Sequence, residues 1–72
     1  MENNMLQLGK YQHYKGGLYE VIGIARHSET KEELVVYRAL TDNFGLWVRP
    51  LTMFLENVEV DGKLILRFKY LG

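Results

Sequence analysis

The amino-acid sequence predicts an all-β domain, namely a small five-stranded barrel with one short helical or 3-10 turn before the last hairpin. Apolar residues recur with a period of two, and no stretch of ten residues shows convincing helical spacing. Short polar turns separate the apolar segments. Closing the sheet also removes exposed edges, which a chain of 72 residues has little material to cover. An open antiparallel sheet is the alternative.

The composition indicates one folded domain. Apolar residues make up 47% of the chain and aromatic residues 12%, so the sequence is unlike that of a disordered protein. We expect the domain to span residues 10–72, after a polar lead over residues 1–9. With no cysteine and only two histidines, the chain has no disulfide framework and cannot close a zinc site. We therefore expect neither a metal nor a cofactor.

The charge balance limits the classes of partner. Nine basic and nine acidic residues cancel, which weakens any proposal of broad, non-specific binding to nucleic acid. No apolar run approaches the length of a membrane-spanning helix. The first residues also lack the basic start and apolar stretch of a signal peptide. We expect a cytoplasmic protein with no membrane partner.

The first hairpin is predicted from two segments rich in β-branched and aromatic residues. Gly16 and Gly17 interrupt the chain ahead of a strand over residues 18–27, and a second strand covers residues 33–40. The polar residues 28–32 between them are typical of a turn, because their side chains bond nearby backbone groups.

A tight turn at the tip would fix the register of this hairpin. If a two-residue turn joins Glu29 to Glu32, Gly23 lies opposite Arg38, where a glycine leaves room for the arginine stem. One face then carries Ile22, Ile24, Arg26, Val35, Tyr37 and Ala39. The other face carries Val21, Gly23, Ala25, His27, Leu34, Val36, Arg38 and Leu40. Neither face is simply polar, so the pattern leaves open which one lines the core.

The middle of the chain predicts a third strand followed by a helical turn. Residues 41–43 favour a turn, because Asp and Asn side chains bond the backbone two residues on, and a strand covers residues 44–49. Pro50 ends this strand, since it has no N–H for the ladder and its fixed φ suits the first turn of a helix. Residues 51–55 are then expected to form one helical or 3-10 turn.

The last hairpin has the clearest pattern. Asp61-Gly62 lies between the strand segments 57–60 and 64–70, and this dipeptide accepts the positive φ values of a type I′ turn. Five strands joined by short turns, with one helical turn before the last hairpin, describe a barrel resembling the SH3-like type.

Four segments of the chain together resemble a known family. They are Tyr11-x-His13-Tyr14-Lys15-Gly16-Gly17-x-Tyr19-x-Val21, Ala25-Arg26-His27-Ser28-Glu29-Thr30, Val35-Val36-Tyr37-Arg38-Ala39-Leu40 and Trp47-Val48-Arg49-Pro50-x-x-Met53-Phe54. This pattern spans roughly residues 10 to 70 and closely resembles the small bacterial family named domain of unknown function 1653 (DUF1653). The resemblance implies a compact, β-rich, SH3-like domain that is usually free-standing in bacteria and has no established activity.

His13 and Tyr14, just ahead of the double glycine, are candidates for a ligand-binding loop. Loops on rigid scaffolds carry binding residues more often than the elements they join. The imidazole can donate or accept a hydrogen bond, and the phenol can stack on a ring. The alternative is a packed loop in which His13 bonds a backbone carbonyl and Tyr14 covers the end of the barrel.

Arg26, His27 and Arg38 are candidates for binding on the first hairpin. Arg26 and His27 precede a serine and a glutamate, which suggests a catalytic cluster. Neighbouring strand residues point to opposite faces, however, so the groups of a catalytic triad do not converge at this spacing. The alternative roles are structural, with Arg26 in an ion pair with a nearby glutamate and His27 capping the turn.

Trp47 and Arg49 are the strongest candidates for a recognition site. They are two apart on a strand, so both side chains project from one face. A tryptophan beside an arginine can hold a planar ring or an anion, through stacking and the forked guanidinium. The alternative is that Trp47 belongs to the core and Arg49 bonds carbonyl groups at the helical turn.

The sequence thus predicts a non-enzymatic binding module with a polar-aromatic groove. Its ligand would be a nucleotide or a short single-stranded nucleic acid, since stacking with arginine support suits a neutral protein better than duplex binding. A second hypothesis is a protein-interaction domain or a homodimer without a small-molecule site. A third is a hydrolase with either histidine as general base beside a glutamate. The candidate ligand-binding residues are His13, Tyr14, Arg26, His27, Arg38, Trp47 and Arg49.

Overall fold

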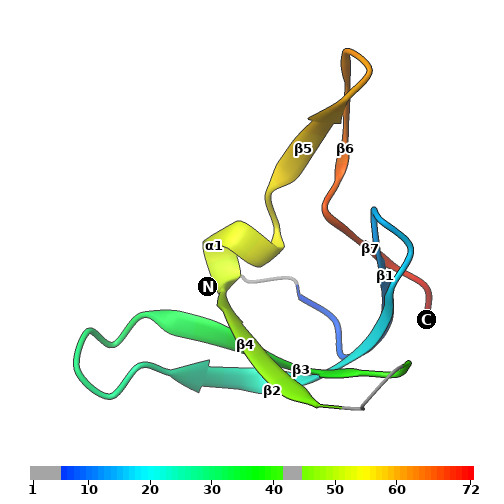
Figure 1. The fold of residues 1–72 in the computed structure, drawn as a ribbon. Helices are drawn as coiled ribbons and strands as arrows, with labels where there is room; N and C mark the ends of the chain where they lie inside the picture. Colours follow the sequence, from blue (N-terminus) through cyan, green and yellow to red (C-terminus); the bar gives the residue numbers. More distant parts are fainter. Residues whose placement is uncertain (1–5, 42–44) are drawn as a thin grey trace.

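The computed structural model describes residues 6–41 and 45–72. It confirms an all-β domain with one short helix (Figure 1). The predicted turn over residues 41–43 lies largely outside the described residues. In chain order, the elements are β1 (Gly9–His13), β2 (Leu18–Arg26), β3 (Glu33–Ala39), β4 (Leu46–Pro50), α1 (Leu51–Phe54), β5 (Asn57–Val60), β6 (Lys63–Leu66) and β7 (Phe68–Tyr70).

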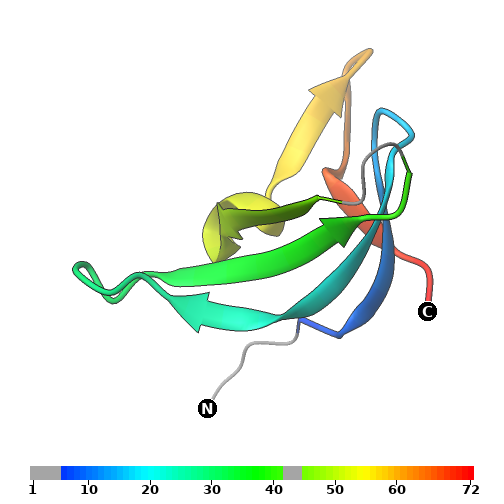
Figure 2. The same ribbon diagram turned by 60° about the horizontal axis from the view of Figure 1, so that its bottom comes forward.

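Five of these strands form one antiparallel sheet in the order β4-β3-β2-β1-β7, and β5 pairs only with β6. The sheet bends strongly, so that β1 and β7 stand at an angle to β3 and β4, and α1 lies inside the bend (Figures 1 and 2). The predicted closed barrel is not found in the described ranges. The physical reason is the break at Arg67, which divides the predicted last strand between two sheets and leaves β4 and β7 as edges.

The register predicted for the first hairpin is wrong. Arg26 lies opposite Glu33, and Gly23 lies opposite Val36 instead of Arg38. The turn is longer than expected, because Lys31 takes a positive φ of 66° and its N–H bonds the carbonyl of the residue that begins the turn.

A β-bulge at Ile22 then changes which residues of β2 face inward. The register shifts between Val21 and Gly23, so one residue of β2 is left without a partner. Val21 is consequently buried beside Tyr37, whereas Ile22 is exposed. The face of β3 that carries Tyr37 and Val35 therefore lines the core, which the sequence pattern had left open.

The core lies inside the bend, between the sheet and α1. Phe54 of α1 stacks on Phe68 with ring centroids 4.0 Å apart, and Tyr11 contacts Phe54 edge-on at 5.4 Å. Pro50 precedes the helix with a φ of −52°, as its ring requires. The buried residues in the described ranges are Tyr11, Val21, Val35, Tyr37, Ala39, Phe54 and Phe68.

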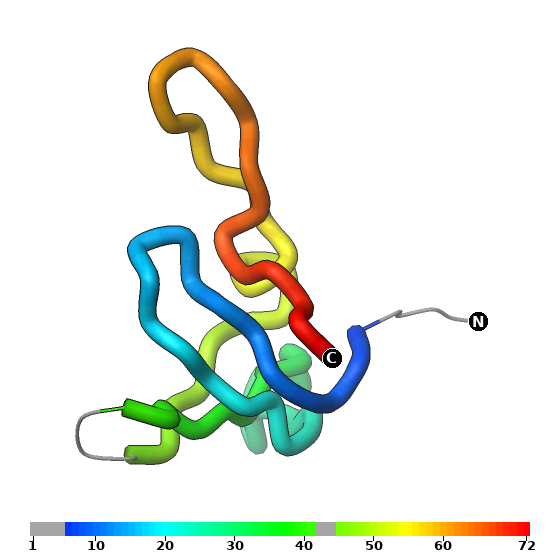
Figure 3. The backbone as a smooth tube through the Cα atoms, turned by 90° about the vertical axis from the view of Figure 1, so that its right-hand side faces the viewer, coloured from blue at the N-terminus to red at the C-terminus, as the bar shows by residue number. Residues whose placement is uncertain are grey.

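The hairpin of β5 and β6, residues 57–66, projects away from the sheet and is called the arm below (Figure 3). Its turn confirms the predicted type I′ geometry, because Asp61 and Gly62 have φ values of 53° and 80°. The apolar side chains of β6 remain exposed, and Leu64 is 72% accessible to solvent. An isolated two-stranded hairpin is marginally stable in water, so the arm depends on its anchorage in the domain.

The sequence pattern did not predict β1. Hydrogen bonds join this strand to the segment before the sheet and to the segment after β7. The hydroxyl of Tyr11 donates to the carbonyl of Gln7 at 2.7 Å and accepts from the N–H of Gln7 at 3.2 Å. At the other end, the N–H of Leu71 donates to the carbonyl of Lys10 at 2.7 Å. These three hydrogen bonds hold the two flanking segments against β1.

Candidate functional site

The inner face of the bent sheet carries most of the aromatic side chains of the domain. Strand alternation and register place on this face the residues Tyr11, His13, Tyr19, Tyr37, Trp47, Arg49, Phe68 and Tyr70. Their rings form successive contacts: Phe68 lies within 5.8 Å, centroid to centroid, of His13, Tyr19 and Tyr37. We call this surface the aromatic face.

Arg49 is held in place by the aromatic face and keeps part of its hydrogen-bonding capacity. Its Nε donates to the hydroxyl of Tyr37 at 3.3 Å, and its guanidinium carbon lies 5.6 Å from the ring centroid of Phe68. Among the described residues, Arg49 has no carboxylate partner. The terminal N–H groups of the guanidinium can therefore be offered to an anion.

Trp47 lies on the same face, but it is not part of the core. It is directly opposite Tyr37 in the ladder and two residues before Arg49. Its side chain is 53% exposed. The exposed indole of Trp47 and the half-buried guanidinium of Arg49 project from one face of the same strand, and a planar group can stack on such a surface.

His13 is the last residue of β1 and lies opposite Phe68 on the aromatic face. Its Nδ1 accepts the N–H of Lys15 at 3.1 Å, so a neutral ring carries its proton on Nε2. Burial lowers the pKa of His13 below its usual value of 6.5, and the charges of Arg49, Arg67 and Lys15 lower it further. The imidazole is consequently neutral at pH 7 and lies in a positive local field.

Of the three cations near His13, Arg67 is paired with a carboxylate, whereas Arg49 and Lys15 have no carboxylate partner among the described residues. Arg67 donates to the Oε1 atom of Glu56 at 3.1 Å, while its buried Nε has no hydrogen-bond partner. The ammonium of Lys15 lies 5.7 Å from the ring centroid of Tyr14, with no carboxylate partner in the described ranges. The charge near His13 is therefore positive on balance, although the chain as a whole is neutral.

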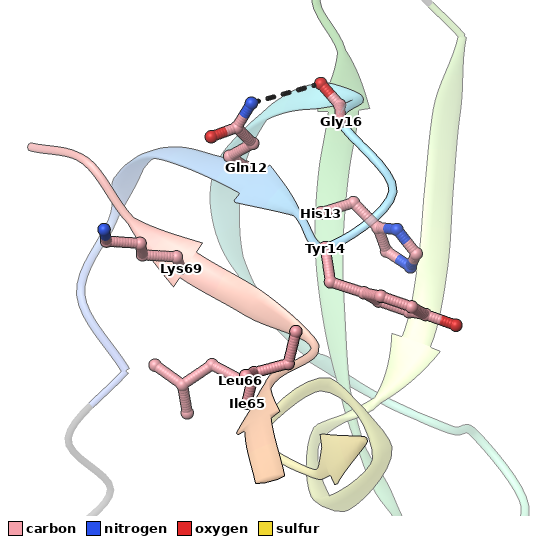
Figure 4. A pocket seen from close by; sticks show the side chains of 7 residues that line it. All are labelled: Gln12, His13, Tyr14, Gly16, Ile65, Leu66 and Lys69. Atoms are coloured by element: carbon pink, nitrogen blue, oxygen red, sulfur yellow. Dashed lines mark hydrogen bonds between the residues drawn. The ribbon is translucent and has the colours of Figure 1, made fainter. Parts of the chain in front are cut away.

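A surface pocket of about 440 Å³ adjoins this region. Its lining residues surround it, with His13 and Tyr14 on the side toward β4 and Lys69 and Leu66 on the opposite side (Figure 4). The β1–β2 turn and the base of the arm both contribute to it. The lining consists of Gln12, His13, Tyr14, Gly16, Ile65, Leu66 and Lys69.

Three of the seven predicted site residues lie elsewhere. Arg26 and His27 are at the far end of the β2–β3 hairpin, and both are exposed. The Nδ1 of His27 accepts the N–H of Glu29 at 3.1 Å and that of Thr30 at 3.4 Å, which is the capping role considered as an alternative. Arg38 is exposed on the outer face of the sheet. The sequence therefore proposed one groove where the structure has separate regions.

The four other predicted residues are His13, Tyr14, Trp47 and Arg49, which lie at or beside the aromatic face. Phe68 and Lys69 were not among the candidates, although Phe68 joins Arg49 to His13. Alternating aromatic residues in the last strand were a signal that could have identified Phe68. Lys69 lines the pocket beside the base of the arm, and the sequence did not reveal where the arm leaves the sheet.

In the described ranges, no group of three or more His, Cys, Asp or Glu residues is arranged to hold a metal ion. No helix there is long and apolar enough to cross a membrane.

The fold and the aromatic face define a class: a small all-β domain whose bent sheet carries, on one side, packed aromatic rings and an arginine with no carboxylate partner among the described residues. The chain belongs to the family described as "Protein of unknown function (DUF1653)", whose pattern matches residues 9–70. A crystal structure of a DUF1653 protein from Bordetella bronchiseptica is similar to it, with 38% sequence identity and a TM-score of 0.86. The similarity covers 93% of this chain and 88% of that one. The comparison with curated proteins found no match.

Proposed function

We propose that this domain is a cytoplasmic, non-enzymatic binding module whose ligand is a nucleotide or a short single-stranded nucleic acid. The observation that carries the proposal is the exposed indole of Trp47 beside Arg49, an arginine without a carboxylate partner in the described part of the chain. Such a ligand combines the two chemical features that this pair can hold, a planar base and a negatively charged phosphate.

The surroundings of Arg49 support an anionic ligand. Its hydrogen bond to Tyr37 and its position over Phe68 fix the guanidinium in advance, so less side-chain freedom is lost on binding. Burial and, secondarily, the nearby positive charges lower the pKa of His13, and the same positive charges favour an anion at this place. The neutral imidazole adds an Nε2–H donor, since its Nδ1 is already bonded to backbone.

A binding role is supported over hydrolysis by the hydrogen bonds of the two histidines. His13 and His27 both use Nδ1 to accept backbone N–H groups, and the bonds within the described ranges join neither of them to a carboxylate. General base catalysis by a histidine usually relies on such an orienting group. The proposal also includes the SH3-like assignment, which the short antiparallel strands and the helical turn before the last hairpin support.

The proposal is tested by titrating the protein into fluorescein-labelled single-stranded RNA and DNA hexamers and measuring anisotropy, with unlabelled mononucleotides as competitors. We expect Trp47→Ala and Arg49→Ala to weaken binding about tenfold or more, since one stacked base contributes about 1–3 kcal/mol. Arg49→Lys, which keeps the charge but loses the fork, should also weaken it. The matched control is Arg38→Ala, on the outer face of the sheet.

Circular dichroism melts of each variant separate loss of the site from loss of the fold. The proposal fails if the folded wild-type domain binds neither the oligonucleotides nor the mononucleotides. It also fails if Arg38→Ala weakens binding as much as Arg49→Ala, because the affinity would then come from general charge.

A second candidate function is self-association, and the observation that favours it is the exposed arm. Leu64 and Leu66 lie on one face of β6, with 72% and 53% of their surfaces exposed, and no strand covers the outer edge of β6 in the described ranges. Pairing with a second copy would bury both side chains. Sedimentation equilibrium tests this, with the double variant Leu64→Ser, Leu66→Ser expected to shift a dimer to monomer. A wild-type monomer at all concentrations measured would exclude it.

A further inference from the structure

We propose that the outer edge of β4 is an interface at which two copies of this chain pair antiparallel and join their sheets. In this pairing Trp47 lies opposite Trp47 of the partner subunit. The inference goes beyond the proposed function and does not depend on it, because the pairing uses backbone groups that the nucleotide is not proposed to contact. It also concerns a different strand from the arm of the second candidate function.

The first observation is that the outer side of β4 is uncovered in the described part of the chain. There β4 pairs only with β3 and lies at the end of the five-stranded sheet (Figures 1 and 2). Leu46, Trp47 and Val48 follow one another along it, and 62%, 53% and 58% of their surfaces are exposed. Edge strands are usually protected by charges, prolines, bulges or short length, and these three positions have no such charge, proline or register shift. The opposite edge, β7, has only three residues with a lysine at their centre.

The second observation identifies the backbone groups that this edge offers. The N–H of Ala39 on β3 donates to the carbonyl of Gly45 at 3.0 Å. Bonded pairs recur at every second residue of an antiparallel ladder, so the backbone groups of Trp47 also point toward β3. Those of Leu46 and Val48 consequently point outward, where a second strand can bond them.

Pro50 agrees with this assignment. It is two residues after Val48, so its nitrogen also lies on the side away from β3. Proline has no N–H, and at such a position the ladder with β3 needs none. The outer edge of β4 therefore ends at Pro50, and its complete donor–acceptor positions are Leu46 and Val48.

The third observation is that the edge is complementary to itself. When Trp47 faces the partner's Trp47, Leu46 faces the partner's Val48, and each outward N–H of these residues meets a carbonyl acceptor. The facing side chains are then apolar on the outer face of the sheet and aromatic on the inner face. A register with Val48 opposite itself would place Leu46 against Pro50 and leave the carbonyl of Leu46 without a donor.

The charges also favour a second copy of the chain as the partner. In this register Arg49 lies diagonally beside the partner's Trp47, so the two arginines do not face each other and each can contact an indole. Nine basic and nine acidic residues cancel, so the two copies carry no net charge of one sign that would keep them apart. A domain of 72 residues buries a small share of its surface, and pairing adds to that share.

Sedimentation equilibrium tests the interface at protein concentrations from about 10 μM to about 1 mM, because a strand of five residues makes a small contact and a weak dimer. We expect the wild type to show a reversible equilibrium between monomer and dimer. Val48→Pro removes the outward N–H and keeps the bonds to β3, so it should stay monomeric. Val48→Thr keeps the N–H and the β-branched shape, and as the matched control it should dimerise within about threefold of the wild type.

Circular dichroism melts show whether each variant is folded. If Val48→Pro does not fold, Val48→Lys replaces it. The position is exposed, so the lysine should leave the fold intact, but a charge at the centre of the edge should prevent pairing.

Disulfide formation tests the register, because the chain has no cysteine of its own. Residues that face each other in a non-hydrogen-bonded pair have Cα atoms about 4.5 Å apart, which a disulfide can span. Trp47→Cys should therefore form a covalent dimer under mild oxidation. Val48→Cys is the control. Its cysteine faces the partner's Leu46 and not its own counterpart, so it should crosslink about tenfold more slowly or not at all.

The inference is overturned if the wild type is monomeric at every concentration, or if Val48→Pro dimerises as the wild type does. It is also overturned if Val48→Cys crosslinks as fast as Trp47→Cys. A dimer that persists in Val48→Pro but is lost in the double variant Leu64→Ser, Leu66→Ser would place the contact in the arm instead. These measurements contain no nucleotide, so their failure leaves the proposed function standing, and the anisotropy titrations decide that function separately.

Discussion

The two histidines of the domain make the same local hydrogen bond in two different regions. Nδ1 of His13 accepts the N–H of Lys15, and Nδ1 of His27 accepts the N–H of Glu29, each at 3.1 Å and each two residues on. Only His13 also lies against aromatic rings, those of Tyr14 and Phe68. His27 is on an exposed turn at the far end of the β2–β3 hairpin.

This difference shows that the elements packed around a turn-capping histidine determine its burial and the charges close to it. The region of His13 brings together β1, β7 and β4, so burial and three nearby cations act on one imidazole. Among the described residues, the region of His27 consists of the tip of the β2–β3 hairpin.

The largest effect is expected for Phe68→Ala in the region of His13. The ring is 5% exposed and stacks on Phe54, so its removal leaves a cavity and should lower the free energy of unfolding by about 3–5 kcal/mol. His27→Ala removes one acceptor and should cost only about 1 kcal/mol. Urea unfolding measures both, with Phe68→Leu as a milder variant if the alanine protein does not fold. Equal costs would show that the two regions are equally important for stability.

A smaller difference is expected between two arginines. Arg49→Ala removes the hydrogen bond to Tyr37 and the contact with Phe68, and should cost about 1–2 kcal/mol. Arg26→Ala, next to His27, should change stability by less than about 0.5 kcal/mol, because the side chain is exposed and has no ion pair in the described ranges. Thermal melts at one pH compare them. A costly Arg26→Ala would reveal an interaction with Glu33, which lies opposite it.

A stabilising change is expected in the region of His27. Lys31 has a φ of 66°, which costs an ordinary residue about 1 kcal/mol or more, whereas glycine adopts it freely. Lys31→Gly should therefore raise stability by about 0.5 kcal/mol, after allowing for the greater chain entropy of glycine. The same change at Lys15, on the other histidine turn, is the control, since Lys15 is not among the residues with positive φ. A loss of stability for Lys31→Gly would mean that the lysine side chain itself stabilises the turn.

The smallest effect is a pH dependence that belongs to His13. Its pKa is lowered in the folded domain by burial and by nearby cations, so the unfolded chain binds the proton first as the pH falls below 6.5. The stabilisation is complete above that value and is lost as the pH falls toward the lower pKa of the folded state. The melting temperature should therefore drop between pH 7 and about pH 5, and His13→Gln should reduce the drop. The His27→Gln control should keep it, and a reversed pattern would contradict the assignment.

Much of the fold could be predicted from local chemistry. Asp61-Gly62 indicated its turn because few other pairs accept two positive φ values, and Pro50 indicated where β4 ends and α1 begins. Alternation alone placed Trp47 and Arg49 on one face, as their ladder partners Tyr37 and Val35 show. β1 was missed, although its alternation of polar and aromatic residues is regular.

The remainder depended on interactions between distant segments. The bulge at Ile22 and the left-handed Lys31 set the register of β2 and β3, and neither residue type signals such a conformation. The apolar run after Gly62 reads as one strand, yet it leaves the arm and joins β1 after Arg67. The candidate groove was divided for the same reason, since the bend of the sheet determines which strand ends meet.

The way the arm joins the domain has a practical consequence for protein engineering. The chain leaves for the arm at Glu56 and returns at Arg67, and these residues are joined by a backbone hydrogen bond of 3.1 Å and by their side-chain ion pair. The arm, residues 57–66, therefore begins and ends at two residues that are bonded to each other. A foreign peptide, or a shorter loop of suitable span, can therefore be grafted in place of the arm without altering the sheet. The domain thus offers a ready position for display.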